Sequence, residues 1–132
     1  MKNIEQALLA RSRAYTPYSN FKVGAAILLK DGTYIHGANI ENASFGLTNC
    51  AERSALYSLY SQGYHKEDIV SITVIANDHG PVSPCGACRQ VMHELMPKDA
   101  KIILANLKGE TMETTPDALL PYAFVLDEKP HE

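Results

Sequence analysis

The cysteines are the residues of this sequence whose type and spacing most directly indicate chemistry. The 132-residue chain has three, Cys50, Cys85 and Cys88, and an odd number cannot pair completely as disulfides. Cys85 and Cys88 form a C-x-x-C pair, and helical spacing places both side chains on one face, about one turn apart. In a reducing compartment such a pair indicates metal binding or redox chemistry rather than a structural disulfide.

The third cysteine favours metal binding. Cys50 opens one predicted helix and Cys85 opens another, so all three sulfurs are expected where the positive ends of two helix dipoles meet. Three thiolates fit a tetrahedral Zn²⁺ site, with one ion per chain, better than a redox pair does. Three protein ligands leave the fourth position open for water or substrate, which is typical of catalytic rather than structural zinc.

Two other interpretations of the cysteines remain open. They could be buried thiols that act as small apolar side chains, although a Pro-Cys-Gly-x-Cys turn at a helix start is a poor place for them. They could also form a closed structural zinc site with His79 or His93 as the fourth ligand. His93 lies five residues after Cys88. At about 100° per residue, it would point away from the face that carries Cys85 and Cys88.

Glu52 is the candidate acid–base group. A lone carboxylate in the first turn of a helix could simply complement the helix dipole. Beside an open metal position, it could instead carry protons between water and a leaving group. Ideal helical spacing puts residues 50 and 52 about 200° apart, so Glu52 and Cys50 share a cavity only if Cys50 is the non-helical cap residue.

Apolar periodicity and turn residues predict the elements that position these groups. We expect a two-residue turn at Asp31-Gly32, a left-handed Gly63 at the end of the helix that Cys50 opens, and a Thr115 cap with Pro116 in the first turn of the last helix. The expected elements are helix 3–14, strands 22–30 and 33–41, helix 50–63, strand 69–76, helix 85–96, strand 101–107 and helix 115–121.

This alternation predicts an α/β fold, a single domain over residues 1–132 with a mixed β-sheet of about five strands sandwiched by helices. The composition, 45% hydrophobic and 20% charged, is that of an ordinary globular domain. The net charge is −3, with twelve Lys and Arg scattered among fifteen acids, so a nucleic-acid partner is not expected. The sequence shows no signal peptide and no run of about 18 apolar residues, which indicates a cytoplasmic protein without a membrane segment.

Three motifs, "NIENAS", "CAERSAL" and "SPCGACRQV", resemble in order and spacing those of the small cytidine deaminases that act on free nucleosides. The likeness extends from about Arg13 to Phe124. It implies zinc-dependent hydrolysis of cytidine and 2'-deoxycytidine to uridine and 2'-deoxyuridine with release of ammonia, in pyrimidine salvage or scavenging. Zinc deaminases use three such ligands and a non-ligand Glu, so the resemblance assigns proton transfer at C4 of the pyrimidine to Glu52.

The resemblance also implies roles for residues that periodicity does not single out. Asn39 and Glu41 match a ribose-binding pair, and side chains at alternate positions of an extended segment point the same way. Phe21 matches a ring near the nucleoside, and the backbone N–H groups near Ala51 could read the base carbonyl. Arg53 matches an arginine that hydrogen-bonds the thiolates, whose three charges outweigh that of Zn²⁺ by one.

The remaining matches concern the substrate and the assembly. Phe124 matches a ring supplied by a neighbouring subunit, which implies a homotetramer whose active sites are completed by neighbouring subunits. Ala43, within "NIENAS", and Phe45 are further substrate-binding candidates. Phe45 stands where the family often has tyrosine, so any contact through that hydroxyl is absent or replaced by water.

Three alternative functions are weighed against this one. A deaminase of a modified cytosine nucleoside, such as blasticidin S, is the closest, although Asn39 and Glu41 favour an unmodified ribose. A polynucleotide deaminase would need a basic surface and aromatic platforms for neighbouring bases. A non-enzymatic zinc module would need a fourth ligand and would show no turnover.

Overall fold

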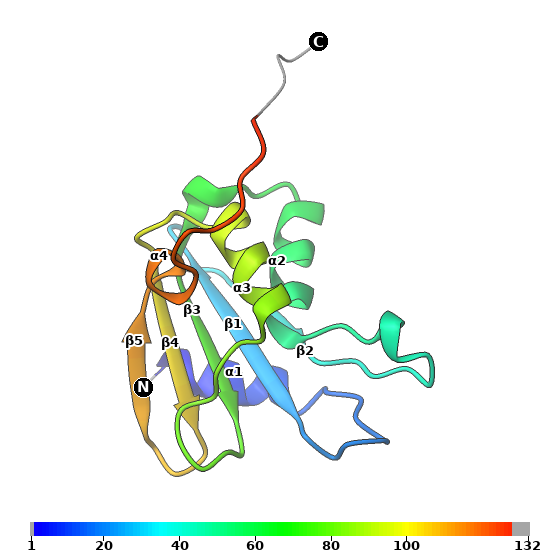
Figure 1. Ribbon diagram of the computed structural model, residues 1–132. Coiled ribbons are helices and arrows are strands. Elements are labelled where there is room, and N and C mark those ends of the chain that lie inside the picture. The colour runs from blue at the N-terminus through cyan, green and yellow to red at the C-terminus, as the bar shows by residue number, and fades with distance from the viewer. Residues whose placement is uncertain (1, 128–132) are drawn as a thin grey trace.

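The computed structural model describes residues 2–127 of the chain (Figure 1). Its strands are β1 (Val23–Leu29), β2 (Tyr34–Ala38), β3 (Ile69–Ala76), β4 (Lys101–Asn106) and β5 (Thr111–Thr114). Its helices are α1 (Lys2–Arg11), α2 (Ala51–Ser61), α3 (Gly86–Leu95) and α4 (Pro116–Leu119), with short 3₁₀ helices η1 (Phe45–Leu47) and η2 (Lys66–Asp68). No helix within residues 2–127 has both the length and the apolar character that crossing a bilayer requires.

The strands form one mixed five-stranded sheet in the order β2-β1-β3-β4-β5, which confirms the predicted sheet. β1 is antiparallel to both β2 and β3, β3 is parallel to β4, and β4 is antiparallel to β5. Isoleucines align across the centre, since Ile27 pairs with Ile35 and Ile72, and Ile72 pairs with Ile102. Because β2 and β3 run in the same direction, the helices that follow them start at the same edge of the sheet.

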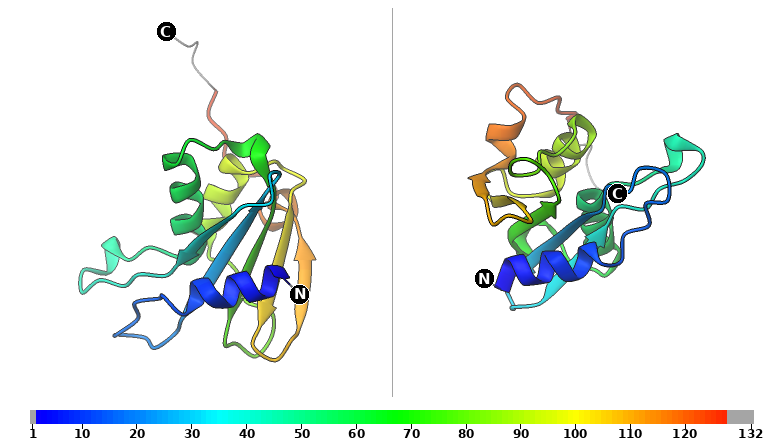
Figure 2. Two further views of the ribbon diagram at one scale, coloured as in Figure 1. Left: turned by 180° about the vertical axis from the view of Figure 1, so that it is seen from behind. Right: turned by 90° about the horizontal axis from the view of Figure 1, so that it is seen from below.

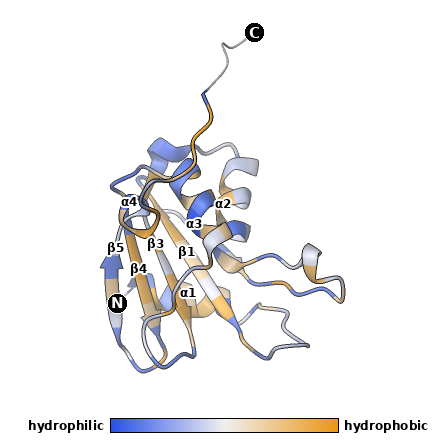
Figure 3. Ribbon diagram, in the orientation of Figure 1, coloured by the Kyte–Doolittle hydropathy of each residue, from blue (hydrophilic) through white to orange (hydrophobic). Residues whose placement is uncertain are grey.

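Helices cover both faces of the sheet, as predicted. α2 and α3 pack side by side on one face and α1 crosses the other (Figures 1 and 2). The larger core lies under α2 and α3, where Leu56, Leu59 and Met92 are fully buried with Ile72 and Leu104 of the sheet. The central strands are hydrophobic along most of their length (Figure 3), which is expected for strands buried on both faces.

Gly37 allows α2 to approach the sheet closely. A Cβ atom at position 37 would lie 2.4 Å from the carbonyl oxygen of Ala51 and 2.4 Å from the backbone nitrogen of Ala55. Any other residue would push the first turn of α2 away from β2. The close approach fixes the backbone that immediately follows Cys50.

The first helix is shorter than predicted, because it ends at Arg11 and not at Ala14. The chain beyond it turns, and Tyr15 forms a parallel bridge with Ile40. The backbone N–H of Tyr15 donates to the carbonyl of Asn39 at 3.0 Å. This pairing with a distant segment satisfies backbone groups that a longer helix would have bonded internally.

The predicted two-residue turn at Asp31-Gly32 was wrong in length. The N–H of Leu29 donates to the carbonyl of Thr33 and the N–H of Gly32 donates to the carbonyl of Leu29, both at 2.9 Å. Residues 30–32 therefore close the hairpin, and of these only Gly32 has a positive φ, 88°. This is the three-residue hairpin in which one left-handed residue follows a type I turn.

The predicted end residue of α2 and the predicted cap of α4 are confirmed. Gly63 has a φ of 92° beyond the end of α2. Thr115 accepts a hydrogen bond from the N–H of Ala118 at 3.2 Å, and Pro116 occupies the first turn of α4. α4 ends at Leu119, two residues earlier than predicted. β5 had no predicted counterpart among the assigned ranges.

Candidate metal centre and active site

The three cysteines come together at the starts of α2 and α3. Cys50 is the N-cap of α2, with extended dihedrals (φ −77°, ψ 157°), and Cys85 is the N-cap of α3 (φ −69°, ψ 168°). Cys88 lies in the first turn of α3 and is fully buried. Since α2 follows β2 and α3 follows the parallel-running β3, the topology of the sheet places both helix starts at one edge.

The geometry of the sulfur atoms fits a single zinc ion. All three Sγ atoms lie within 4.8 Å of one another, and Cys50 and Cys85 are 3.9 Å apart. Tetrahedral ligands with Zn–S distances of about 2.3 Å are separated by about 3.8 Å, so little rearrangement is needed. Within residues 2–127 no other group of three His, Cys, Asp or Glu side chains lies close enough to share an ion.

Arg53 adjusts the charge of the cluster. Its guanidinium donates to Cys50 Sγ at 3.2 Å, and the hydrogen bond raises the pKa of Arg53. A hydrogen bond from Cys88 and the contact with Arg53 lower the pKa of Cys50 to about 5. The hydrogen bond to Cys50 and burial raise the pKa of Cys88. In the metal-free protein, Cys50 therefore ionises before Cys88.

Replacing Arg53 tests whether its contact with Cys50 lowers the pKa of that thiol. In metal-free Arg53→Gln protein the alkylation midpoint of Cys50 should move from about pH 5 to higher pH, because a hydrogen bond and a positive charge beside the thiolate are lost. Alkylation near pH 5, assigned to Cys50 by peptide mapping, should slow roughly fivefold. Arg13→Gln is the control, since Arg13 bonds His36 instead of a sulfur. If the pH dependence of Cys50 alkylation were unchanged in Arg53→Gln, Arg53 would not be a cause of the lowered pKa of Cys50.

Glu52 meets the condition that its spacing from Cys50 imposed. Cys50 is the non-helical cap residue, and Glu52, in the first turn of α2, is only 5% exposed. Burial raises the pKa of the Glu52 carboxyl and the charge of Cys50 raises it further, while a hydrogen bond with Cys88 opposes the rise. A buried carboxyl beside the thiol cluster, with its pKa moved toward neutrality, can both accept and release a proton.

Asn39 and Glu41 connect two loops next to the cluster. The Asn39 amide accepts from the N–H of Val23 and donates to the carbonyl of Phe21, both at 2.8 Å. The Glu41 carboxylate accepts from the hydroxyl of Ser19 and from its N–H at 3.2 Å, and these bonds lower the pKa of Glu41.

The segment that holds this pair reaches the metal ligands through backbone pairing. Ile40 and Asn49 form an antiparallel bridge with reciprocal hydrogen bonds of 3.0 Å. Asn49 immediately precedes Cys50, so the predicted ribose pair lies on a strand end bonded to the start of the metal site. Phe21 is held to the same strand end through Asn39.

Comparison with known proteins identifies the family. A model of the cytidine and deoxycytidylate deaminase zinc-binding region matches residues 1–104. The chain belongs to this family. It is 58% identical over 125 residues to the cytidine deaminase of Halalkalibacterium halodurans, covering 95% of this chain and 93% of that protein. It is 50% identical over 123 residues to that of Sporosarcina psychrophila, covering 93% and 89%.

Solved structures of the family share the fold. A crystal structure of cytidine deaminase from Burkholderia pseudomallei superposes with a TM-score of 0.91 at 51% identity, covering 93% of this chain and 97% of that one. A structure from Mycobacterium leprae gives a TM-score of 0.76 at 38% identity, covering 91% and 95%. The predicted family and fold class are confirmed, and the cysteine cluster fits the zinc site that the family model names.

Three candidate residues lie away from the cysteine cluster within the chain. Ala43 and Phe45 lie in the segment between β2 and α2, which projects away from the sheet (Figure 1), and Phe45 is 79% exposed. Phe124 is 67% exposed on the C-terminal segment. The single chain thus brings Cys50, Cys85, Cys88, Glu52 and Arg53 together and leaves these three residues exposed to solvent.

Sequence reasoning missed Ser19, whose hydroxyl donates to Glu41 and accepts from the N–H of Phe21 at 3.0 Å. A turn serine two residues before an aromatic residue was the available signal, because serine hydroxyls commonly bond backbone groups two residues ahead. His93, considered as a fourth ligand, instead bonds Asp117 of α4 at 3.2 Å and takes no part in the sulfur cluster.

Proposed function

We propose that this member of the family deaminates cytidine and 2'-deoxycytidine by hydrolysis, forming uridine and 2'-deoxyuridine and releasing ammonia. The observation that carries the proposal is a buried Glu52 beside three cysteines that supply three ligands and no fourth within residues 2–127. A structural zinc module would need that fourth ligand. The curated relatives that carry the name cytidine deaminase support the choice of substrate.

Cys50, Cys85 and Cys88 are the residues that would hold zinc. When bound, zinc supplies a Lewis acid that makes water a better nucleophile near neutral pH. Arg53 reduces the excess negative charge of the three thiolates by donating to Cys50 at 3.2 Å.

Glu52 is proposed as the group that moves protons. Water adds its oxygen to C4 of the cytosine ring, and the C4–N bond to the amino group breaks. The Glu52 carboxylate takes one proton from the attacking water and delivers it to ring N3. It then carries the second proton from the new C4 hydroxyl to the amino nitrogen, which leaves as ammonia as the C4 carbonyl of the uracil ring forms. Burial favours this role because a carboxyl with a raised pKa is a better match for proton exchange near neutral pH.

The first turn of α2 and the 39–41 strand end are proposed to orient the nucleoside. The side chain of Cys50 makes no capping hydrogen bond to the helix, so N–H groups near Ala51 are free to bind the base carbonyl. The Asn39 amide retains one proton and one lone pair beyond its bonds to Val23 and Phe21. Together with Glu41, this amide can bind ribose hydroxyls while continuing to hold Phe21.

The proposed assembly is a homotetramer in which Phe124 completes the active site of a neighbouring subunit. Exposed apolar side chains support this: Phe45 and Leu47 lie on the projecting segment, and Val125 and Leu126 follow Phe124. Such side chains are more favourably buried in an interface than left in water. Ala43 and Phe45, on the projecting segment, are proposed to lie near substrate only in the assembled protein.

A mixed-oligomer experiment tests the shared site. Glu52→Gln chains keep Phe124, whereas Phe124→Ala chains keep Glu52. After co-refolding with saturating zinc, some sites will combine an intact Glu52 with an intact Phe124 from another chain. Activity should then exceed the weighted sum of the two parent variants. If activity equals that sum although mixed oligomers form, Phe124 acts within its own subunit or only in packing.

The function itself is tested by metal analysis with an absorbance assay on cytidine, 2'-deoxycytidine and blasticidin S. The proposal expects about one zinc per chain and turnover of the first two substrates, because three thiolates make one site. Turnover of blasticidin S alone would favour a deaminase of modified nucleosides. Zinc-loaded protein with no turnover of any substrate would favour a structural module.

A further inference from the structure

Arg89 of α3 uses all three of its guanidinium nitrogens to bond two other parts of the chain, residues 83–84 and Leu119. Its Nε donates to the carbonyl of Pro84 at 2.9 Å, one Nη donates to the hydroxyl of Ser83 at 2.8 Å, and the other donates to the carbonyl of Leu119 at 3.0 Å. All three acceptors are neutral oxygen atoms. The planar guanidinium fork suits such a three-way contact, which a lysine ammonium cannot reproduce with the same geometry.

Two of these contacts support a metal ligand. Ser83 and Pro84 immediately precede Cys85, and the backbone N–H of Arg89 donates to the carbonyl of Cys85 at 3.0 Å. Arg89 therefore bonds the chain both at Cys85 and just before it. The N–H of Cys88 in turn donates to Cys85 Sγ at 3.4 Å. The Arg89 side chain therefore bonds the two residues that lead directly into Cys85.

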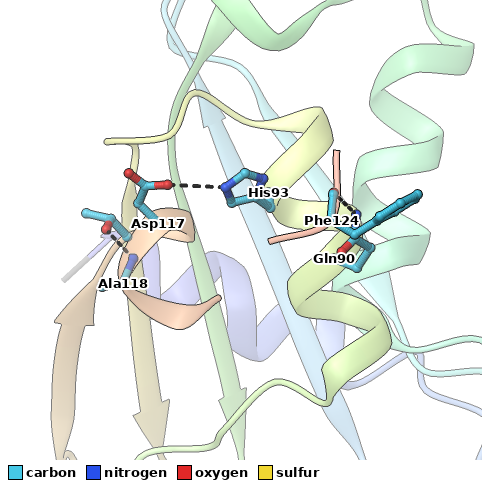
Figure 4. A network of polar contacts seen from close by, with 6 residues as sticks. Gln90, His93, Asp117, Ala118 and Phe124 are labelled. Atoms are coloured by element: carbon cyan, nitrogen blue, oxygen red, sulfur yellow. Dashed lines mark hydrogen bonds and ion pairs between the residues drawn. The ribbon is translucent and has the colours of Figure 1, made fainter. Parts of the chain in front are cut away.

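The third hydrogen bond of Arg89, to Leu119, is one of several from α3 to the C-terminal segment. Leu119 is the last residue of α4, and the chain continues from it to Phe124. Gln90 donates to the backbone carbonyl of Phe124 at 3.1 Å, and His93 bonds Asp117 at 3.2 Å (Figure 4). The helix α3 thus begins at the Cys85 ligand, and side chains along its length hydrogen-bond the segment that leads to Phe124.

We propose that Arg89 is a positioning residue that couples the Cys85 ligand to the segment that carries Phe124, with Gln90 completing the grip on that segment. The part that concerns Phe124 rests on the proposed function, whereas the part that concerns Cys85 does not. Residues that orient metal ligands without touching the metal typically change metal affinity by about 10- to 100-fold. Arg89 acts through backbone and hydroxyl groups, so the lower end of that range is expected.

Zinc release tests the Cys85 part without any substrate. Transfer of zinc from the folded, loaded protein to a colorimetric chelator should be about tenfold faster in Arg89→Gln than in wild type. Ser83→Ala, which removes one acceptor, should show a smaller increase, and Arg89→Lys should lie between Arg89→Gln and wild type. Arg13→Gln, which removes an arginine bonded to His36, should release zinc at the wild-type rate.

A residue that only supported the fold would lower the unfolding temperature of the metal-free protein and leave zinc release from the folded protein unchanged. Equal release rates for Arg89→Gln and wild type would therefore overturn the Cys85 part. If Arg89→Gln does not fold, Arg89→Lys and Ser83→Ala decide the matter by the same measurement.

The C-terminal part is tested by the kinetics of cytidine turnover. Gln90→Met keeps the length of the side chain and loses the donor to Phe124, so KM should rise about fivefold with kcat and zinc release near wild type, a loss typical of one hydrogen bond. Arg89→Gln should raise KM and also speed zinc release. Unchanged KM in both variants would overturn the coupling. If wild-type protein turns over no cytidine, the proposed function fails while zinc release still decides the role of Arg89.

Discussion

Glu52→Gln should lose about 10²- to 10⁴-fold in kcat while retaining zinc and the fold, because an amide of nearly the same shape cannot carry a proton. The same substitution should leave the stability of the metal-free protein unchanged or raise it. Burial raises the pKa of Glu52, so the ionised carboxyl is disfavoured in the folded protein. It therefore lowers stability above the ordinary carboxyl pKa, and this loss is complete only once the pH exceeds the raised value. Metal-free Glu52→Gln protein should unfold at neutral pH at the same or a higher denaturant concentration than wild type.

Glu5→Gln is the matched control for this variant. Glu5 also lies in the first turn of a helix, but on α1, at the opposite face of the sheet from α2 and α3. Loss of an exposed carboxylate at a helix start should cost about 0.3 to 1 kcal/mol of stability and leave the rate of deamination unchanged. Equal rates for Glu52→Gln and wild type would show that Glu52 serves only the helix dipole.

Cys85→Ser should lose zinc and activity together while keeping the helix start intact. Serine is a favoured N-cap residue and can accept the N–H of Cys88 that Cys85 Sγ now accepts at 3.4 Å. It cannot replace a thiolate as a zinc ligand. Zinc affinity, measured by competition with a chelator, should fall by more than about 100-fold, since even groups outside the ligand set cost about 10- to 100-fold.

Cys85→Ala separates the loss of the ligand from the loss of the cap. Alanine removes both, so metal-free Cys85→Ala should be less stable than metal-free Cys85→Ser by about 0.5 to 1 kcal/mol, measured by denaturant unfolding. Zinc content should be equally low in both. Stoichiometric zinc with full turnover in either variant would rule out Cys85 as a ligand.

Some elements could be predicted from the sequence because their causes are local. Helices begin where a cap residue meets backbone N–H groups, and they end where a glycine takes a left-handed conformation. The helix starts near Cys50 and Cys85, the Thr115 cap and the positive φ of Gly63 all follow from such short-range chemistry. The sequence left open whether Cys50 is the non-helical cap residue, and the structure shows that it is. Buried β3 was equally clear, since its residues are apolar or β-branched with little interruption.

Other elements depended on partners far away in the chain. The residues of β5, "TMET", are exposed or half-buried and have no strong pattern, so the strand exists because β4 offers it a free edge. α1 ends early because Tyr15 pairs with Ile40. Nothing in the sequence around Arg89 distinguishes it from other helix residues. Its bonds to both Ser83 and Leu119 exist only because the fold brings these distant residues within reach of one side chain.

The candidate site divides in the same way. The sequence by itself determined which groups are available, namely three thiols and a carboxylate near two helix starts, because residue type and the approximate start of a helix are properties of a few neighbouring residues. Only the tertiary structure decided that Cys50 and Cys85 lie 3.9 Å apart. Their distance is set by β1, which pairs with both β2 and β3 and aligns them in one direction, and strand pairing between distant segments leaves no local signal.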